Sequence, residues 1–382
     1  MGFSMGKILS MYILLVAVGA LLLLSGWEAK PALEQPVEYA VWSPYWTVQP
    51  GFTSTMEMKN NRAKETLRVV VSLYFAGGEE YHLDPILLGP RQTIVMNLNR
   101  VVESLPVSVA ERATKEGTAE VKFGGPNNAA LMGSISVTNP ERGIAWNFRL
   151  YPVKPTLAVT PVRGLFWFPD EDTDGFVAVQ NASEEFITVL PKLQIASAFY
   201  SLAPISLGSG QGFKLELRKE LRKLGLGEAM AGGIDFSYQG PPDALKAHGV
   251  LFNNRGFSAE IDFTRSDSSP EPQVLALRTP RFAIGKADPA LGLPEPTIFE
   301  PVLALHNFST QGLAVTLSVG YRAGGIVKEA QVSISLPASN TRILSLRPYL
   351  EGVVPPDAHW ASLEVSYRDR QNSLSGALVS VS

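Results

Sequence analysis

Short runs in which large apolar residues occupy alternate positions fill most of the chain after residue 35. Three of them, MEMKN (56–60), VAVQN (177–181) and LALHN (303–307), all end in Asn. Alternation with a period of two over four to eight residues, bounded by Gly, Pro, Asn or Asp, is typical of half-buried β-strands. The pattern therefore predicts an all-β chain, with about seven or eight strands in each stretch of roughly 115 residues.

The strand pattern recurs three times in the same order, which indicates an internal repeat. The segment HLDPILLGPRQTIVMNL (82–98) aligns without a gap with SLAPISLGSGQGFKLEL (201–217), at a constant offset of 202 − 83 = 119 residues. A third copy, AQVSISLPASNTRILSL (330–346), is more distant. The residues shared by the first two copies are Leu83, Pro85, Ile86, Leu88, Gly89, Gln92 and Leu98, which recur as Leu202, Pro204, Ile205, Leu207, Gly208, Gln211 and Leu217.

Three tandem antiparallel β-sandwiches of the immunoglobulin-like type are the architecture that best fits all-β units of this size. We expect them at residues 36–151, 156–264 and 273–382. The chain has no Cys, so the disulfide of antibody domains is absent and the resemblance is one of architecture only. A short helix is expected directly after Leu98, Leu217 and Leu346, and LELRKELRKLGL (215–226) shows its period best.

The first 35 residues follow a different pattern. Lys7 is the only charged residue before an apolar stretch from Ile8 to Trp27, and about 20 residues at 1.5 Å each span roughly 30 Å, the hydrocarbon thickness of a bilayer. Residues 1–29 are therefore either an uncleaved membrane anchor, with residues 8–27 in the bilayer, or a cleaved signal peptide. Both place the remaining residues outside the cytoplasm, and an exported chain without Cys indicates a bacterial cell envelope.

An acidic loop stands out in FPDEDTDGFVAVQN (168–181). Asp170, Asp172, Asp174 and Gly175 match the first half of a calcium loop, in which alternate carboxylates turn inward and Gly allows a sharp bend. The second half does not match, because Asn181 stands where a bidentate carboxylate is needed. The sequence thus leaves two interpretations: a calcium site, or an Asp-Gly turn that closes a β-hairpin with its acids in water.

Aromatic residues gather in the strand that opens each unit, and Trp46 and Trp167 are the candidate ligand-binding residues among them. Consecutive aromatics such as FWF (166–168) point to both faces of a strand, so one face could be exposed and stack on sugar rings. In the competing interpretation, these side chains fill the core and the contacts between neighbouring units.

An Asn ends the second strand of each unit: Asn60, Asn181 and Asn307. The last two begin glycosylation sequons, Asn181-Ala-Ser183 and Asn307-Phe-Ser309. Because the first unit has Asn60 without a sequon, we interpret all three as strand-end residues that tolerate left-handed backbone geometry.

The third unit differs from the others at its final strand. The first two units continue into GIAWNFRL (143–150) and GFSAEIDF (256–263), and the third has no counterpart of this strand. A sheet edge left open in this way can accept a strand from a protein partner. Alternatively, a shorter sandwich tolerates the open edge, or the N-terminal linker covers it.

Composition narrows the function classes. The net charge is −3 and no basic block occurs, so a nucleic-acid surface is not expected. The four His residues are far apart, and no nucleophile elbow, phosphate loop, dinucleotide fingerprint or metal-ligand cluster is present. Apart from the calcium loop, the sequence suggests no cofactor. It favours a non-catalytic, exported cell-envelope protein that makes structural, adhesive or scaffold contacts; the alternative is an extracytoplasmic ligand- or carbohydrate-binding protein that uses exposed aromatic strands.

Overall fold

The computed structural model describes residues 38–152, 161–265, 273–294, 296–323, 326–350, 354, 358–369 and 373–381. These residues form several antiparallel sheets joined by a few short helices, so the prediction of an all-β chain is confirmed. The predicted anchor or signal peptide, with its apolar stretch 8–27, lies outside the described residues. None of the helices in the part of the chain that the structure describes combines the length and the apolar character of a membrane span.

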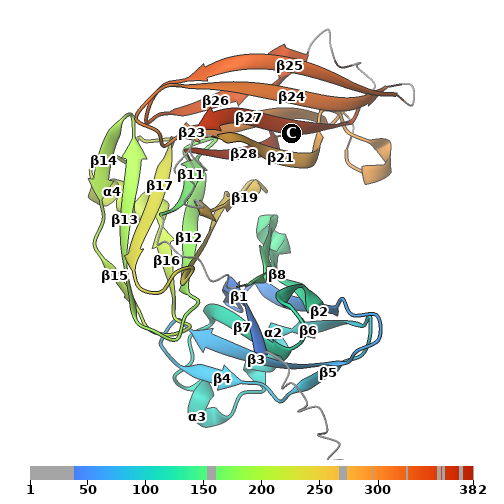
Figure 1. Ribbon diagram of the computed structural model, residues 1–382, viewed down its shortest axis with the longest axis vertical. Coiled ribbons are helices and arrows are strands. Elements are labelled where there is room, and N and C mark those ends of the chain that lie inside the picture. Colours follow the sequence, from blue (N-terminus) through green and yellow to red (C-terminus); the bar gives the residue numbers. More distant parts are fainter. Residues whose placement is uncertain are drawn as a thin grey trace, which may run out of the picture. The chain divides into compact units, whose positions relative to one another are not determined.

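The first sheet pair comprises residues 38–152, drawn in blue to green in Figure 1. One sheet has the strand order β10-β1-β7-β3-β4, with β5 also beside β3, and the other has the order β6-β2-β8-β9. The strands are β1 (Glu38–Thr47), β2 (Thr53–Asn60), β3 (Leu67–Phe75), β4 (Glu80–His82), β5 (Ile86–Leu88), β6 (Thr93–Asn97), β7 (Glu116–Gly124), β8 (Leu131–Asn139), β9 (Ile144–Arg149) and β10 (Tyr151–Pro152). The helical segments are α2 (Leu98–Glu103), α3 (Val107–Ala110), η1 (Asn128–Ala130) and η2 (Pro140–Arg142).

The second sheet pair, residues 161–265, repeats this topology strand for strand. Its sheets have the orders β14-β13-β17-β11-β20, with β15 also beside β13, and β16-β12-β18-β19. The elements are β11 (Val162–Trp167), β12 (Asp174–Asn181), β13 (Ile187–Ile195), β14 (Ala198–Ser201), β15 (Ile205–Leu207), β16 (Gly212–Glu216), α4 (Leu217–Lys223), β17 (Ala231–Gln239), β18 (Leu245–Phe252), β19 (Ser258–Asp262) and β20 (Thr264–Arg265).

The third sheet pair, residues 273–381, follows the same plan with fewer strands. Its sheets have the orders β21-β27-β24-β25 and β22-β23-β26, with β28 also beside β23. The elements are β21 (Gln273–Ala283), β22 (Gly285–Lys286), η3 (Pro289–Leu291), β23 (Ile298–Asn307), β24 (Leu313–Ala323), β25 (Ile326–Leu336), β26 (Thr341–Ser345), α5 (Arg347–Leu350), β27 (Trp360–Asp369) and β28 (Leu374–Val381). Among these described residues, β28 pairs with β23 alone, and it also contacts β11 and β19 of the second sheet pair.

Each sheet pair encloses an apolar core, the first of which also includes Phe176, Ala178 and Val250 of the second pair, and one ring holds the same place in all three. Trp46, Phe166 and Phe282 lie on the opening strand opposite Gly117, Gly232 and Ala361, respectively. A small residue is needed there, because a Cβ on Gly232 would lie 2.7 Å from the Phe166 ring. The sequence pattern that opens each unit therefore builds the centre of each core, where these rings are buried.

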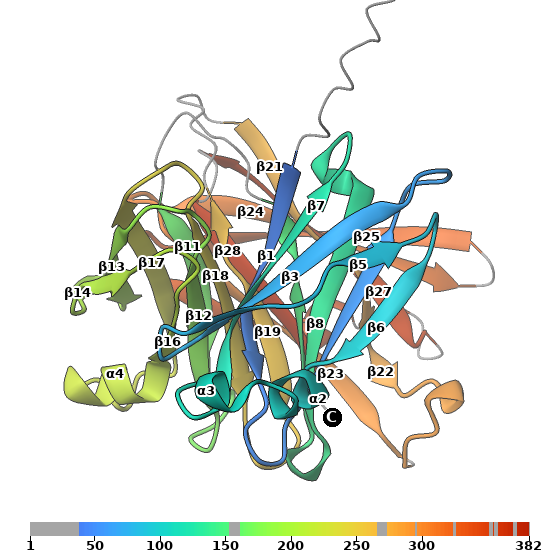
Figure 2. The same cartoon turned by 90° about the horizontal axis from the view of Figure 1, so that it is seen from below.

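The short helices lie where the repeat predicts them. Helices α2 and α4 directly follow strands β6 and β16, as Figure 2 shows for α4, and one residue separates α5 from the end of β26. Leu217 and Leu221 of α4 point into the second core and are buried. The division into three domains stays a prediction, since residues 38–382 hold together as one compact unit.

Candidate functional site

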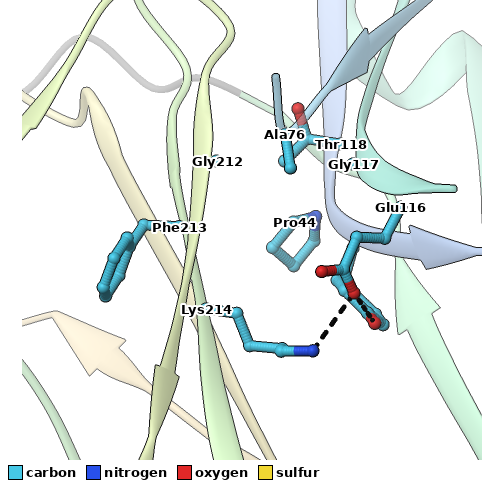
Figure 3. A pocket seen from close by; sticks show the side chains of 9 residues that line it. Pro44, Ala76, Glu116, Gly117, Thr118, Gly212, Phe213 and Lys214 are labelled. Atoms are coloured by element: carbon cyan, nitrogen blue, oxygen red, sulfur yellow. Dashed lines mark hydrogen bonds and ion pairs between the residues drawn. The ribbon is translucent and has the colours of Figure 1, made fainter. Parts of the chain in front are cut away.

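A cleft of about 130 Å³ opens where the first and second sheet pairs meet (Figure 3). Strands β1 and β7 supply one wall, and the start of β16 supplies the other. We call it the 1–2 cleft. Its lining residues are Pro44, Tyr45, Ala76, Glu116, Gly117, Thr118, Gly212, Phe213 and Lys214.

The polar centre of the 1–2 cleft is the carboxylate of Glu116. Its Oε2 accepts a hydrogen bond from the Tyr45 hydroxyl at 2.7 Å and pairs with Lys214 Nζ at 3.2 Å. Burial of the Tyr45 phenol raises its pKa far above the usual range, and the neighbouring Glu116 charge adds to this effect. The phenol therefore stays protonated and serves as a hydrogen-bond donor, and Figure 3 shows Lys214 reaching across from β16 while Phe213 points away.

Two glycines of the second sheet pair allow the close approach beside this cleft. Gly210 has φ +68° and lies against the Tyr74 ring, and a Cβ on Gly212 would collide with the Thr118 side chain. In return, Thr118 Oγ1 donates a hydrogen bond to the Gly210 carbonyl at 2.6 Å. The GSGQG stretch (208–212) of the second repeat is thus fitted to the first sheet pair, whereas the first repeat has GPRQT (89–93).

The charged groups of the 1–2 cleft pair with each other from opposite walls, Glu116 from the first sheet pair and Lys214 from the second. The lining holds one carboxylate, already bound by a phenol and an ammonium group, and it includes no His. Within the described ranges, no three His, Asp or Glu side chains are grouped so that they could hold a metal ion. Lys214 Nζ also lies 5.4 Å from the centroid of the Phe176 ring, which adds a cation–π contact.

Trp42 and Trp167 lie at the interfaces between successive sheet pairs. Trp42 stacks on Tyr74 with ring centroids 5.8 Å apart, and both pack with Ala182 of the second pair. Trp167 packs with Leu165 and with residues of β23 and β28, among them Ala304. We call these contact surfaces the 1–2 interface and the 2–3 interface.

The expectation that an aromatic face of the opening strands is exposed is wrong for both candidate residues. Trp46 is fully buried in the first core, where its Nε1 donates to the Thr118 carbonyl at 2.7 Å and its ring meets the edge of Phe75. Trp167 is 6% exposed at the 2–3 interface. A ligand-binding role for these two residues stays a prediction, although their ring faces contact protein.

The 2–3 interface also contains a buried imidazole. His306 Nε2 donates to Gln194 Oε1 at 3.0 Å, and its Nδ1 accepts from the Thr341 hydroxyl at 2.7 Å. Burial, helped by the positive charge of Arg163, lowers the pKa of His306 to about 3. Arg163 itself pairs with Asp235 at 2.8 Å, so the imidazole is a neutral hydrogen-bonding group at neutral pH.

The acidic loop lies between β11 and β12, and Arg255 pairs with two of its carboxylates. Arg255 Nη2 pairs with Asp170 Oδ2 at 3.0 Å and with Asp172 Oδ2 at 2.8 Å. Asp174 Oδ1 accepts from the backbone of Gly175. Burial acts to raise the pKa of Asp170, but hydrogen bonds from Thr173 and the Arg255 charge hold it below its usual range.

The loop is not a hairpin turn, so that expectation is wrong. β11 pairs with β17 and β20, whereas β12 pairs with β16 and β18, and the loop therefore joins two different sheets. Arg218 of α4 fixes the loop by donating to the backbone carbonyls of Asp170 and Thr173. The calcium hypothesis stays a prediction, with the added condition that a cation must compete with Arg255.

No protein-family model matches the sequence, and no curated protein matches it significantly. Sequence reasoning missed Tyr45, Glu116 and Lys214 as a group, because Glu116 and Lys214 are 98 residues apart. The one signal that could have found them is the replacement of PRQT by SGQG between aligned repeats.

Proposed function

We propose that the protein is a non-catalytic scaffold of the bacterial cell envelope. It consists of three tandem immunoglobulin-like β-sandwiches, exported by residues 1–29 and presented outside the cytoplasm for contacts with other envelope components. Two features support the tandem-module part of the proposal: two sheet pairs with identical strand order, and a third on the same plan.

The observation that carries the scaffold role is the burial of side chains between successive sheet pairs. Trp42 and Trp167 are 4% and 6% exposed, each against residues of the next pair. Large aromatic side chains contribute most to the stability of such contacts. A protein that holds its modules in fixed relative positions needs buried interfaces of this kind, whereas a flexible string of binding modules does not.

The carbohydrate-binding alternative has less support. It depends on aromatic faces that are open to solvent, and Trp46 and Trp167 are the residues from which it was inferred. Both are buried, so ligand stacking would require them to leave the core or the 2–3 interface at a large cost in stability.

The absence of Cys from the chain makes the compartment directly measurable. Val274 is 76% exposed, so a Val274→Cys variant should react with a membrane-impermeant maleimide in intact spheroplasts. An Ala119→Cys variant is the matched control, since Ala119 is fully buried and should stay unlabelled until denaturation. Labelling of Val274→Cys only after cell lysis would place these residues in the cytosol and rule out the envelope role.

The scaffold part is tested by cross-linking in cells. Complexes formed by the native chain should be lost or reduced in a Trp167→Ala variant, which loosens the 2–3 interface. They should persist in Phe199→Ala, whose ring is 62% exposed outside the described interfaces. Equal recovery of complexes from both variants would contradict a role for fixed module positions.

A further inference from the structure

The first two sheet pairs are each closed by a strand that passes from one sheet to the other. In the first pair, β9 runs antiparallel to β8. The chain then crosses to the other sheet, where it forms β10 and pairs with β1. In the second pair, β19 pairs with β18, and β20 then pairs with β11. We call residues 143–152 and 256–265 the closing segments.

The closing segments place apolar side chains at the open side of each core, and in the first pair Trp146 and Phe148 also pack against Phe176 and His248 of the second pair. In the first, the alternate residues Trp146, Phe148 and Leu150 are buried. In the second, Ile261 is buried, and the Phe263 ring lies 2.7 Å from the position that a Cβ on Gly164 would take. Each closing segment therefore combines backbone pairing to a sheet edge with large apolar side chains at positions i and i+2.

The third sheet pair has the two sheet edges to which the closing segments of the other pairs bind. Among its described residues, however, there is no closing segment. β28 corresponds to β8 and β18, since Leu374 lies opposite Asn307 as Leu131 lies opposite Asn60. On the other sheet, Leu277 of β21 is paired with Val365 of β27. Val41 of β1 is paired with Val121 of β7 at the equivalent position of the first sheet pair. Val41 is one of the residues that pair with β10, so the edge at Leu277 is where a closing segment would arrive.

A cleft of about 80 Å³ opens between these two edges. Its walls are mainly apolar and reach into the third core. We call it the edge cleft, and the side chains that line it include Leu277, Leu303, Leu305, Leu363, Val365 and Leu378.

The edge cleft lies where the first closing segment places Leu150. The backbone amide of Leu150 donates a hydrogen bond to the Gly133 carbonyl at 2.9 Å. The Leu150 side chain lies so close that its Cδ1 would be 2.8 Å from a Cβ placed on Gly133. Gly376 is the equivalent of Gly133 in the third pair. It lies two residues after Leu374, and Gly133 lies two residues after Leu131. Around Gly376 the nearest side chains are Leu305 and Leu277 of the same core, and Gly376 itself lines the edge cleft.

We propose that the edge of β28 and the edge cleft bind an extended segment of a second polypeptide, antiparallel to β28, with large apolar side chains at positions i and i+2. The chemistry of this partner is that of the closing segments, whose place it takes. The chain's own residues 29–37, AKPALEQPV, are a poor occupant, because they contain two Pro and no pair of large apolar residues at that spacing. This inference names the kind of partner that the proposed scaffold would bind.

The test uses the chain's own closing segments as probes. A fluorescein-labelled peptide GIAWNFRLYP (143–152) is titrated with the full-length chain in detergent, and GFSAEIDFTR (256–265) serves as a second probe. Both should bind saturably. A matched peptide with Phe148→Ser and Leu150→Ser keeps the backbone but lacks the anchors, and should bind more than about tenfold more weakly.

The binding place is then mapped, because the first peptide could instead exchange with β9. With benzoylphenylalanine in place of Phe148, photo-cross-links should fall within residues 273–279 and 374–380. Cross-links within β8, or no saturable binding of either peptide, would overturn the proposal.

A covalent variant gives an independent measurement. Residues 143–152 joined through a flexible linker after Ser382 should raise the melting temperature by about 5 °C or more and abolish peptide binding. The same extension with Phe148→Ser and Leu150→Ser should do neither. An unchanged melting temperature with the intact extension would also count against the proposal. Peptide binding by the purified chain does not depend on export. The maleimide experiment therefore tests the envelope location, the peptide experiments test the edge of β28, and either proposal can fail without the other.

Discussion

Asn181 Nδ2 lies 2.9 Å from the carbonyl oxygen of Gly208, to which it donates a hydrogen bond inside the second sheet pair. The same amide also donates to the carbonyl oxygens of Glu185 and Leu207. Its Oδ1 accepts from the backbone of Ser183 at 3.0 Å. One fully buried side chain thus ties the end of β12 to the following loop and to the strand before Gly208.

Asn60 and Asn307 make the same contacts in the other two sheet pairs. Asn60 donates to the carbonyls of Glu65, Leu88 and Gly89, and Asn307 donates to those of Gln311, Leu336 and Pro337. None of the three Asn residues has a positive φ, so the interpretation as left-handed strand ends is wrong. The side-chain amides explain the repeat instead, and their burial leaves no amide free for a glycan at Asn181 or Asn307.

Replacing Asn181 by Ala should lower the free energy of unfolding by about 2–4 kcal/mol, because it leaves buried carbonyl groups without a donor. Urea titration followed by tryptophan fluorescence measures the change. Asn61→Ala is the matched control: the Asn61 side chain donates an exposed hydrogen bond to the Ala129 carbonyl, and its loss should cost less than about 1 kcal/mol. Equal costs for the two variants would contradict the role assigned to the buried amide.

Much of the fold could be predicted from local pattern, because strand alternation and turn residues act over short distances. The tripled runs ending in Asn60, Asn181 and Asn307 all form strands, and the helix after Leu217 lies where the repeat places it. The alternation does not show which other part of the chain each face of a strand packs against. Trp42 and Trp167 continue apolar strands like any core residue, yet both contact the next sheet pair.

The candidate sites were less predictable because they depend on residues far apart in sequence. The match of Asp170 and Asp172 to a calcium loop was visible, but their partner Arg255 lies more than 80 residues away. In the same way, the hydrogen bond from Thr118 to Gly210 spans 92 residues. A single sequence carries no signal for such pairs beyond the change of residue type between repeats.

A Trp46→Ala variant should lower the free energy of unfolding by about 3–5 kcal/mol, because it leaves a cavity at the centre of the first core and a carbonyl without its donor. Phe199→Ala, at a ring that is 62% exposed, should change it by no more than about 0.5 kcal/mol. Glycan-array binding measured on the same two proteins separates the two functions. Retained stability in Trp46→Ala, with loss of a bound sugar, would favour the carbohydrate-binding alternative.

The stability of the chain should fall as pH is lowered below about 6.5, in part because of His306. An unfolded His binds a proton near pH 6.5, whereas the folded chain holds the pKa of His306 at about 3. Between these values the unfolded state binds more protons, so the free energy of unfolding decreases by up to about 1.4 kcal/mol per pH unit.

Substitution His306→Gln removes this proton uptake. The variant should be less stable than the native chain at pH 7, where hydrogen bonds to Gln194 and Thr341 are disturbed, and the difference should shrink as the pH falls toward 4. His82→Gln, at a His whose side chain is 64% exposed, is the control for the loss of one imidazole. If the free energy of unfolding changes with pH in the same way for the native chain and for His306→Gln, the role assigned to His306 would be contradicted.

The acidic loop should gain affinity for Ca²⁺ when Arg255 is replaced by Ala. Arg255 now forms ion pairs with Asp170 and Asp172, and a divalent cation that uses the same oxygens must displace its guanidinium group. The calcium-dependent rise in melting temperature should therefore be larger for Arg255→Ala than for the native chain. Arg222→Ala, on α4 away from these two ion pairs, is the control for the loss of one positive charge. If millimolar Ca²⁺ shifts the melting temperature of none of the three proteins, Asp170, Asp172 and Asp174 are not a calcium site, and the pairing with Arg255 accounts for the first two.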